Sequence, residues 1–347
     1  MNIEEISTEY SEYWDSVVSS FHNYDVCYLC GYAKAFMESG EGTPYLIYIN
    51  NESTRAINVV MKRDISGFQT FKEALEPNEW YDISSPYGYG GFLVEGCEYD
   101  AINSTYDKYC RDQGIISEFV RFNLFSDYHH FYNGTVEART HNVIRSLDIP
   151  LENIKMDFEH KVRKNIKHAV SAGLEIKIDP QGEYLEDFIK IYQMTMDRNN
   201  ASSKYYFSNS FFEKLLLMKN NAIFFHVEFE GSIISTELVL YAGDRCYSFL
   251  GGTDSNYYHL RPNDLLKFEV IKWGQNNGLK YYILGGGYGD DDGIFRYKKS
   301  FAPNGIYTFY IGKKICNFKK YEILCDLKSR KDKVLANEHF FPSYRAT

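Results

Sequence analysis

Hydrophobic and polar positions follow the clearest pattern in the second half of the chain. Apolar side chains recur at helical spacing over residues 184–199 and 211–218. Three apolar runs follow as strands, separated by glycine-containing dipeptides of the kind found in hairpin turns. The pattern predicts helices 184–199 and 211–218, strands 222–229, 232–241 and 245–250, helix 263–273, strand 280–284, helix 291–299 and strand 305–311.

The first half repeats part of this order with weaker signals. Its pattern predicts helix 26–37, strands 44–49, 55–62 and 91–94, helix 101–111 and strand 115–122. In each half a helix and a glycine, Gly114 or Gly278, precede an apolar strand. The two glycines lie about half a chain length apart, which indicates an internal repeat. The element order of the second half is similar to that of the GCN5-related N-acetyltransferase (GNAT) fold.

Length and composition narrow the class of protein. A chain of 347 residues exceeds the usual size of one hydrophobic core, so we expect two domains with a junction near residues 148–156. The net charge of −9 argues against a basic surface covering the whole protein. Aromatic residues make up 17% of the chain, which suits strands and also ligands of mixed polarity.

Several features predict a cytoplasmic protein. The acidic start has no apolar segment typical of a signal peptide, and no run of 18 apolar residues could span a membrane. Seven cysteines, an odd number scattered along the chain, fit a reducing compartment better than a disulfide framework. We expect no metal site, because Cys27 and Cys30 have no second pair nearby and are interpreted as buried thiols.

Three stretches carry a more specific resemblance: YDISSPYGYGG from Tyr81, HKVRKNIKHAVSAGLEI from His160, and GIFRYKKSFAPNG from Gly293. Their order and spacing resemble the FemABX group of peptidoglycan bridge-forming aminoacyltransferases and the related FemAB/BioF2-like acetyltransferases. The resemblance implies an α/β (α+β) fold of two tandem GNAT-like domains with mixed, mostly antiparallel sheets. We expect these domains at residues 1–152 and 153–315, with the tail, residues 316–347, packing back on the first.

The resemblance also implies a catalytic lysine. In Tyr297-Lys298-Lys299-Ser300-Phe301, Lys298 takes the place of the lysine in the family's Phe-Lys-x-x-Phe pattern. An ammonium group there could stabilise the oxyanion that forms on the attacked carbonyl, or bind a phosphate. The alternative is an ordinary surface lysine.

Residues around Lys298 complete a candidate site. The neighbouring Arg296 and Tyr297 are expected to bind substrate. Asp290 opens the predicted helix and, with Glu237, is a candidate proton acceptor. The alternative for the aspartates at this position is charge that complements the helix dipole.

The first half contributes four further candidates for substrate binding. Tyr87 and Tyr89 lie in a glycine-rich loop where the backbone could approach a sugar or peptide closely; the alternative is a tight turn packed by its own rings. Arg121 and Asn123 fall where FemABX enzymes carry an Arg-x-Asp pattern before proline. Here Asn replaces Asp and the proline is missing, which weakens a base role at this position.

The motifs around helix 263–273 leave two acyl donors open. The glycine-rich pyrophosphate loop of acetyl-CoA enzymes is absent before helix 263–273, although Arg261 and Asn263 could receive an anion. The basic segment from His160 could meet the phosphates of a charged tRNA or could be a solvated helix face. Aminoacyl-tRNA and acyl-CoA therefore both remain as donors, and no tightly bound cofactor is expected.

These observations predict a FemABX-like acyltransferase that moves an aminoacyl or acyl group onto an amine of a cell-envelope precursor, a peptidoglycan peptide or an amino sugar. One alternative is an acyl-CoA-dependent N-acetyltransferase acting on an amino sugar or polysaccharide precursor. Another is a non-catalytic module that binds a peptide or sugar nucleotide.

Overall fold

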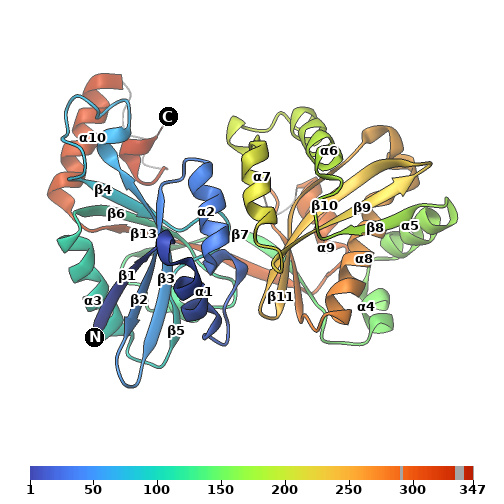
Figure 1. Ribbon diagram of the computed structural model, residues 1–347, viewed down its shortest axis with the longest axis horizontal. Helices are drawn as coiled ribbons and strands as arrows, with labels where there is room; N and C mark the ends of the chain where they lie inside the picture. The colour runs from blue at the N-terminus through green and yellow to red at the C-terminus, as the bar shows by residue number, and fades with distance from the viewer. Residues whose placement is uncertain (290–291, 333–339, 347) are drawn as a thin grey trace. The chain divides into compact units, whose positions relative to one another are not determined.

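The chain forms two compact units in the computed structural model, which describes residues 1–289, 292–332 and 340–346. Unit 1 comprises Met1–Arg139 and Phe309–Thr347, and unit 2 comprises Thr140–Thr308. The chain crosses from unit 1 to unit 2 within β7 (Thr135–Ser146) and returns within β13 (Ile306–Ile315), as Figure 1 shows. Strands β7 and β13 are therefore each divided between the two units.

Unit 1 is built around the strand order β1-β2-β3-β4-β6-β13, with β5 paired to β3. Strands β4 and β6 run parallel, and the other recorded pairs in the unit are antiparallel. Its elements are β1 (Asn2–Ser7), α1 (Ser11–Ser19), α2 (Cys30–Glu38), β2 (Thr43–Asn50), β3 (Arg55–Asp64), β4 (Tyr81–Ser84), β5 (Leu93–Glu95), α3 (Tyr99–Asp112), β6 (Ile115–Arg121) and α10 (Phe318–Asp332).

Unit 2 has the strand order β7-β12-β11-β10-β9-β8. Here β11 and β12 are the parallel pair among otherwise antiparallel partners. Its elements are α4 (Leu151–Asp157), α5 (His160–Ser171), β8 (Glu175–Asp179), α6 (Leu185–Arg198), α7 (Asn209–Leu216), β9 (Ala222–Phe229), β10 (Ser232–Ala242), β11 (Arg245–Thr253), α8 (Pro262–Asn276), β12 (Tyr281–Gly285) and α9 (Gly293–Lys299).

The two units share one topology. Each has a run of four antiparallel strands, then a parallel fifth strand and an antiparallel sixth. Gly114 ends α3 before β6 and Gly278 ends α8 before β12, with φ of 67° and 73°, a region that costs glycine no steric strain. The predicted fold class, α/β with mixed, mostly antiparallel sheets, is confirmed. The repeat around these two glycines is present in the fold.

The structure corrects several predicted elements. The basic segment HKVRKNIKHAVSAGLEI, interpreted as a helix, is helical only up to Ser171, because Gly173 adopts a φ of 80° and strand β8 follows. Helix 26–37 is a 3₁₀ turn, Val26–Tyr28, followed by α2. The sequence pattern did not predict β1; it predicted a strand closing at residues 147–150 but gave no start for it, and β7 is that strand. The element order predicted for the second half, from α6 to β13, is confirmed.

The unit boundaries differ from the predicted junction near residues 148–156. Strand β7 pairs with β12 up to Ser146, and Leu147 is buried in the core of unit 2. The chain thus enters unit 2 before the predicted junction. That the units fold as separate domains stays a prediction.

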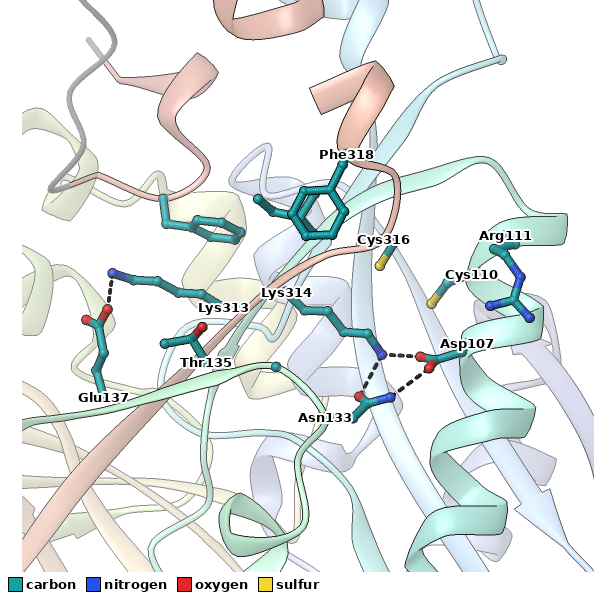
Figure 2. Close-up of a pocket in the computed structure, with 13 residues that line it drawn as sticks. Asp107, Cys110, Arg111, Asn133, Thr135, Glu137, Lys313, Lys314, Cys316 and Phe318 are labelled. Carbon is teal, nitrogen blue, oxygen red and sulfur yellow. Dashed lines mark hydrogen bonds and ion pairs between the residues drawn. The ribbon is translucent and has the colours of Figure 1, made fainter. Parts of the chain in front are cut away.

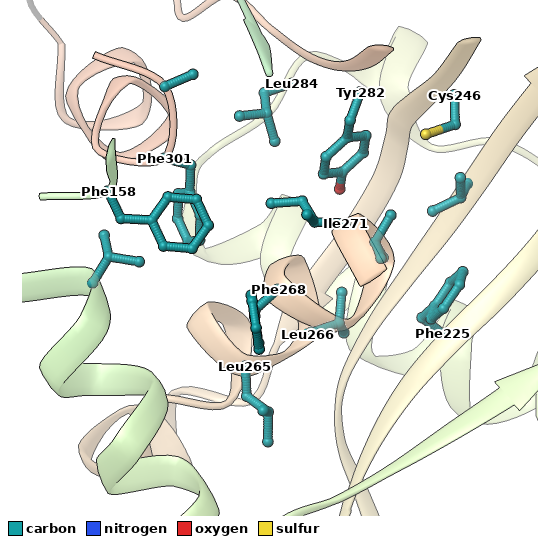
Figure 3. Close-up of a cluster of buried hydrophobic side chains, with 14 of the residues drawn as sticks. Phe158, Phe225, Cys246, Leu265, Leu266, Phe268, Ile271, Tyr282, Leu284 and Phe301 are labelled. Carbon is teal, nitrogen blue, oxygen red and sulfur yellow. The ribbon is translucent and has the colours of Figure 1, made fainter. Parts of the chain in front are cut away.

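Helix α8 lies at the centre of the core of unit 2. Leu265, Leu266 and Ile271 are buried on it, together with Phe158 and Phe301 from other elements (Figure 3). The sequence DLLKFEVIKW is apolar on more than one face, as expected for a helix covered on several sides. A charged side chain within this run must therefore find its partner inside the protein.

The described C-terminal segment belongs to unit 1. The Tyr344 hydroxyl donates to Asp82 over 3.0 Å and lies 2.7 Å from the hydroxyl of Ser117. Arg345 forms an ion pair with the same carboxylate, which Arg63 also contacts at 2.6 Å. This buried cluster ties the end of the chain to β4 and β6.

Candidate functional site

A cavity of about 520 Å³ opens in unit 2 where its two parallel strands part. β11 and β12 pair only over residues 245–247 and 281–283, although β11 continues to Thr253. The part of β11 beyond this pairing lines the cavity. In open α/β sheets, ligands bind outside the carboxyl ends of parallel strands where the order of strands switches. We call this the Lys298 cavity.

Five of the predicted site residues line the Lys298 cavity: Glu237, Arg261, Asn263, Tyr297 and Lys298. They come from β10, from the start of α8 and from α9, which are distant in sequence. The fold thus brings together residues that the sequence analysis selected separately. Their roles stay predictions.

Lys298 lies on α9 with its ammonium group against the loop that follows β12. Its Nζ donates to the carbonyl oxygen of Gly286 over 2.6 Å. Gly285 has a φ of 78°, and a Cβ built there would lie 3.4 Å from this Nζ, so the loop passes close to the lysine. Burial and the nearby charge of Lys267 lower the pKa of Lys298 to about 8, against the opposing effect of Glu237 and Asp292. The amine is therefore close to its titration point near neutral pH.

Glu237 belongs to a buried hydrogen-bonded group that the sequence analysis did not find. Lys267 donates to Glu237 over 2.7 Å, to Ser248 over 2.5 Å and to Tyr282 over 3.3 Å. The Tyr282 hydroxyl donates to the other carboxylate oxygen of Glu237 over 2.5 Å. Glu237 and Lys267 are only 2% and 7% exposed. A buried ion pair of this kind needs additional hydrogen bonds to offset desolvation, and these are present.

One signal could have identified Lys267. It is the only charged residue within Leu265-Leu266-Lys267-Phe268, a stretch whose other side chains are predicted to be buried. Its partner, Glu237, comes from a different strand. β10 changes register against β11 one residue beyond Glu237, between Leu238 and Val239, and irregularities of this kind occur often beside active sites.

The acidic loop before α9 has a structural role in the described part of the chain. Asp290 lies outside the described residues. Asp292 is the N-cap of α9 and accepts from the backbone N–H of Phe295 at 2.7 Å and of Gly289 at 3.1 Å. Although burial opposes it, these backbone donors hold the pKa of Asp292 below its usual value. This supports the helix-capping interpretation for Asp292.

Arg261 and Arg296 lie beside a second cavity of unit 2, of about 620 Å³. Arg261 lines both cavities and has left-handed backbone angles, φ 62° and ψ 41°, which are uncommon for a residue with a side chain. Arg296 is exposed and lines only the second cavity. Tyr297 lines both, and burial raises its pKa.

The four candidates from the first half of the chain lie in unit 1. The Tyr87 carbonyl accepts from the Tyr32 hydroxyl over 2.6 Å. The Tyr89 ring meets Phe309 edge-on at a centroid distance of 5.8 Å. Both tyrosines are half-buried against residues outside their loop, and their role in substrate binding stays a prediction.

The other two candidates in unit 1 are engaged with its backbone and core. Arg121 donates to the Ser85 carbonyl over 3.2 Å, and burial lowers its pKa. The Asn123 amide donates to Asp25 over 3.1 Å and accepts from the Phe125 N–H over 2.9 Å. Asn123 is 3% exposed, so these contacts favour a structural role over substrate binding.

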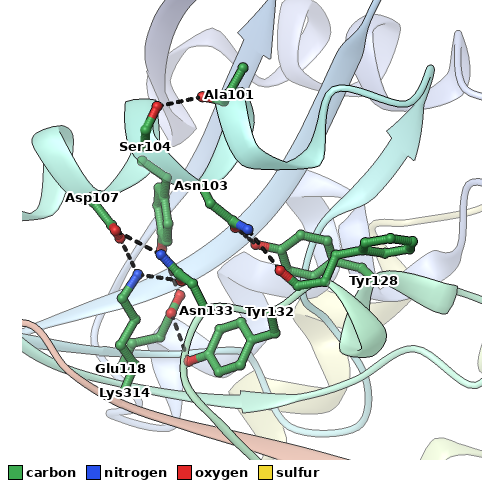
Figure 4. Close-up of polar contacts among 11 residues, drawn as sticks. Ala101, Asn103, Ser104, Asp107, Glu118, Tyr128, Tyr132, Asn133 and Lys314 are labelled. Carbon is green, nitrogen blue, oxygen red and sulfur yellow. Dashed lines mark hydrogen bonds and ion pairs between the residues drawn. The ribbon is translucent and has the colours of Figure 1, made fainter.

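Unit 1 has its own cavity, of about 620 Å³, which contains none of the predicted site residues (Figure 2). Its lysines are paired: Lys313 with Glu137 at 2.6 Å, and Lys314 with Asp107 and, at 2.7 Å, with Asn133. Figure 4 shows a polar cluster that shares Asp107, Asn133 and Lys314 with this cavity, and in it Glu118 accepts from Tyr106 and Tyr132. The two lysines, neutralised in this way, offer little to an anionic ligand.

No three histidine, cysteine or acidic side chains among residues 1–289, 292–332 and 340–346 cluster as metal ligands would. None of the helices within those ranges has the length and apolar character needed to cross a bilayer. Cys27 and Cys30 are buried, and burial raises the pKa of the Cys30 thiol to about 11.

Comparison with known proteins supports the resemblance. Residues 156–299 match the acetyltransferase (GNAT) domain family. Lipid II:glycine glycyltransferases from Staphylococcus epidermidis and Staphylococcus haemolyticus are 29% and 26% identical over 89 and 88 residues, which are 26% and 25% of this chain. The matched region spans only about a fifth of those relatives, 21% of each.

Solved structures show the same fold over nearly the whole chain. FemX superimposes with a TM-score of 0.71 at 15% identity, over 93% of this chain and 99% of FemX. The C-terminal domain of a protein described as a lysylphosphatidylglycerol synthetase, from Agrobacterium fabrum, gives 0.56 at 11% identity, over 90% of this chain and 93% of that domain. The predicted resemblance is thus confirmed: the chain has the fold of FemX, and residues 156–299 resemble the GNAT acetyltransferase family.

Proposed function

We propose that this protein is an acyltransferase that moves an aminoacyl or acyl group onto an amine of a cell-envelope precursor, with the reaction taking place in the Lys298 cavity. The observation that carries the proposal is the position of Lys298. Its buried amine faces the opening between β11 and β12, in the part of the chain that resembles GNAT enzymes. The FemX-like fold and the glycyltransferase relatives support the same class of reaction.

In the proposed reaction, the acceptor amine attacks the carbonyl carbon of the donor ester or thioester. The C–N bond forms as the carbonyl oxygen becomes an oxyanion, and the donor's alcohol or thiol then leaves. The protonated Lys298, held against the Gly286 carbonyl, stabilises the oxyanion. A protein nucleophile is unnecessary, because the donor is already activated.

Glu237 acts through its charge rather than as a proton acceptor in this proposal. Its two carboxylate oxygens are occupied by Lys267 and Tyr282. It therefore holds Lys267 at the cavity wall and offsets part of the positive charge around Lys298. The proton of the attacking amine leaves through another group, for which Asp290 stays a candidate.

Two donors fit the proposal. Charged tRNA is favoured by the glycyltransferase relatives and the FemX-like fold, and it would place the reaction in the cytoplasm. Acyl-CoA is the second candidate, because residues 156–299 match an acetyltransferase domain family. The acceptor is proposed from the lipid II named for the relatives.

The test is an assay with labelled aminoacyl-tRNA or acetyl-CoA and a peptidoglycan precursor as acceptor. Lys298→Met should lower kcat by about 10²–10³, the effect of removing one donor to an oxyanion. Lys190→Met, an exposed lysine on α6, is the matched control and should keep the wild-type rate. Equal rates for the two variants would exclude Lys298 from the transfer step.

A further inference from the structure

We propose that Cys110 and Cys316, in the wall of the unit 1 cavity, form a reversible dithiol site, which a small disulfide or a peroxide oxidises to an intramolecular disulfide. The cavity measures about 620 Å³, and both cysteines line it (Figure 2). Both are present as thiols in the structure. Because the site lies in unit 1, it does not depend on the transfer reaction proposed for unit 2.

The two thiols are in contact. Cys110 lies near the C-terminal end of α3, and Cys316 follows directly after β13. Figure 2 shows their sulfur atoms facing one another from these two elements. The hydrogen bond between the thiols is the largest of the causes that raise the pKa of Cys110, followed by burial. Two sulfur atoms that already share a hydrogen bond need only a short approach to reach bonding distance.

The protein holds both thiols on regular elements of one sheet and its covering helix. The backbone N–H of Cys316 donates to the Ile116 carbonyl over 2.8 Å, which continues the pairing of β13 with β6. Cys110 is 1% exposed in a core cluster that includes Ile115 of β6, and Cys316 packs against the same cluster. The fold therefore fixes the distance between the two thiols, as a flexible loop would not.

The two cysteines differ in their access to solvent, and this difference sets the order of the reaction. Cys316 is partly exposed, whereas Cys110 is buried. A buried thiol stays protonated and unreactive, so the oxidant reacts first with Cys316. The hydrogen bond from Cys316, which is the largest cause of the raised pKa of Cys110, is lost in that step. Cys110 then becomes the second thiol of the reaction.

Atoms and electrons balance with either class of oxidant. With glutathione disulfide, the Cys316 thiolate attacks one sulfur atom, releases one glutathione and leaves a mixed disulfide. The Cys110 sulfur then attacks the Cys316 sulfur and releases the second glutathione, so that the protein loses two electrons and two protons. With hydrogen peroxide, Cys316 passes through a sulfenic acid, and two water molecules leave.

The disulfide would fasten the segment between β13 and α10 to α3. It closes a loop of about 200 residues, and a cross-link restricts the unfolded chain more as the loop it closes becomes longer. The oxidised protein should therefore be more stable than the reduced protein. In a reducing compartment the pair stays as thiols until an oxidant appears.

The test is peptide mapping of the full chain by mass spectrometry, after incubation with excess glutathione disulfide and alkylation of the remaining thiols. The wild type should yield a linked pair of peptides that contain Cys110 and Cys316, and a reductant should separate them. Cys97→Ala removes an exposed thiol of the same unit and is the matched control, which should form the same link. On heating, the oxidised wild type should unfold at least about 5 °C above the reduced wild type.

Single variants test the order of the two steps. In Cys110→Ala, Cys316 has no second thiol to react with, so a glutathione adduct should remain on Cys316 in place of the link. Cys316→Ala leaves only the buried thiol, and Cys110 should stay unmodified. Alanine keeps both positions small and apolar, and thermal unfolding under reducing conditions shows whether each variant is folded.

The absence of a link between Cys110 and Cys316 in the oxidised wild type would overturn the site, and this result requires no variant. A link between other cysteines in its place would do the same. A glutathione adduct on Cys110 in folded Cys316→Ala would overturn the order of the steps. An equal or lower unfolding temperature for the oxidised protein would overturn the claim that the fold accommodates the bond. None of these measurements uses transfer activity, so failure of the proposed function would leave them unchanged.

Discussion

The ammonium group of Lys298 is surrounded by charges of both signs. Lys267 on α8 lowers the pKa of Lys298, while Glu237 on β10 and Asp292 at the start of α9 raise it, and burial lowers it most. The Gly286 carbonyl accepts its hydrogen bond. The balance leaves a pKa of about 8, so small changes in these charges alter the protonated fraction near neutral pH.

Two substitutions should move this pKa in opposite directions. Lys267→Met removes a positive charge and frees Glu237, so the pKa of Lys298 should rise above 8. Asp292→Asn removes a negative charge while keeping a side chain that caps α9, so the pKa should fall. Carbon-13 NMR of the reductively methylated protein, titrated with acid and base, measures both values.

The controls for this titration lie at the same residue. Lys298→Arg removes the signal and so identifies it in the spectrum. Because protonated Lys298 is the proposed active form, activity should decline above pH 8 in the wild type and at higher pH in Lys267→Met. If the pKa of Lys298 shifted in the same direction in Lys267→Met and Asp292→Asn, the two variants would be acting through a change in structure rather than through charge.

Arg261 combines backbone strain with a position at both cavities of unit 2. A residue with a side chain in left-handed conformation costs about 1–3 kcal/mol, and glycine avoids this cost. Arg261→Gly and Arg261→Ala remove the same guanidinium, but only alanine keeps the strain. Urea denaturation should show the glycine variant to be more stable than the alanine variant by about 1 kcal/mol.

Anion binding, unlike stability, should be the same in the two Arg261 variants. The sequence analysis predicts that Arg261 receives an anion, so both variants should bind inorganic pyrophosphate more weakly than the wild type and to the same extent, because each loses the guanidinium. Equal stability of the two variants would show that the left-handed conformation carries no strain. Unequal binding would show that the backbone, rather than the charge, contacts the anion.

At the scale of elements, the pairing of β8 with β9 contains a buried titratable contact. His226 on β9 is fully buried, lies 3.5 Å from Asp179 on β8 and contacts the Thr236 hydroxyl at 2.8 Å. Burial lowers the pKa of His226 although Asp179 favours the charged ring. Asp179 accepts backbone N–H groups from the turn after β8, including Gly182 at 2.7 Å.

His226 should make the stability of the protein depend on pH. The unfolded chain takes up the histidine proton near pH 6.5, whereas the folded protein takes it up only at lower pH. The free energy of unfolding should therefore fall as the pH drops below about 6.5. The pKa of Asp179 is lowered, so its own contribution is lost only on further acidification, as the pH falls from its unfolded value of about 3.9 through its folded pKa.

The variant His226→Gln isolates this effect. Urea denaturation at pH 7.5 and 5.5 should show a smaller decrease in stability on acidification for the variant than for the wild type. His160, which is exposed at the start of α5, provides the control as His160→Gln and should leave the decrease unchanged. An identical decrease in wild type and His226→Gln would place the acid sensitivity elsewhere.

How far the sequence predicts these elements depends on what each one packs against. The order from α6 to β13 follows from helical periodicity and hairpin turns, which are local signals. Strand β7, with the sequence TVEARTHNVIRS, has no regular alternation, and its pairing with β12 joins residues more than 130 positions apart. Single-sequence patterns do not record such partners.

The residues of the candidate site also fall into two groups: those that a local motif indicates and those whose burial depends on distant partners. Lys298 was found through a motif, and the structure places it at a cavity with four other predicted residues. Lys267 was missed because a lysine in a helix usually points to solvent. Its burial depends on Glu237 from another strand, which periodicity within one helix cannot indicate. Asn123 has two partners, Asp25 and the Phe125 N–H, that favour a structural role.

At the scale of the whole molecule, the two units repeat one topology but exchange their sixth strands. Unit 1 is completed by β13, which follows the elements of unit 2 in the sequence, and unit 2 by β7, which follows those of unit 1. A cut in the middle of the chain therefore removes a strand from each sheet. The boundaries of a stable fragment should follow the contacts rather than the midpoint of the sequence.

Two fragments test this expectation. Residues 140–308 contain all of unit 2, whereas residues 153–315 follow the boundary expected from the sequence. The second fragment lacks the part of β7 that pairs with β12, together with Val143 and Leu147, which are 0% and 3% exposed in the core. Burying two such side chains contributes about 3–6 kcal/mol, a large part of the stability of a typical domain.

We expect the fragment of residues 140–308 to unfold cooperatively on heating and the fragment of residues 153–315 to aggregate or to lack a transition. Loss of β7 exposes one edge of β12, and an unpaired edge promotes association between chains. Circular dichroism during heating, with light scattering, distinguishes these results. Cooperative unfolding of both fragments at the same temperature would show that β7 is not required for unit 2, and the boundary near residue 152 would then describe the domain better. Failure of the first fragment alone would show that unit 2 depends on unit 1 for its stability.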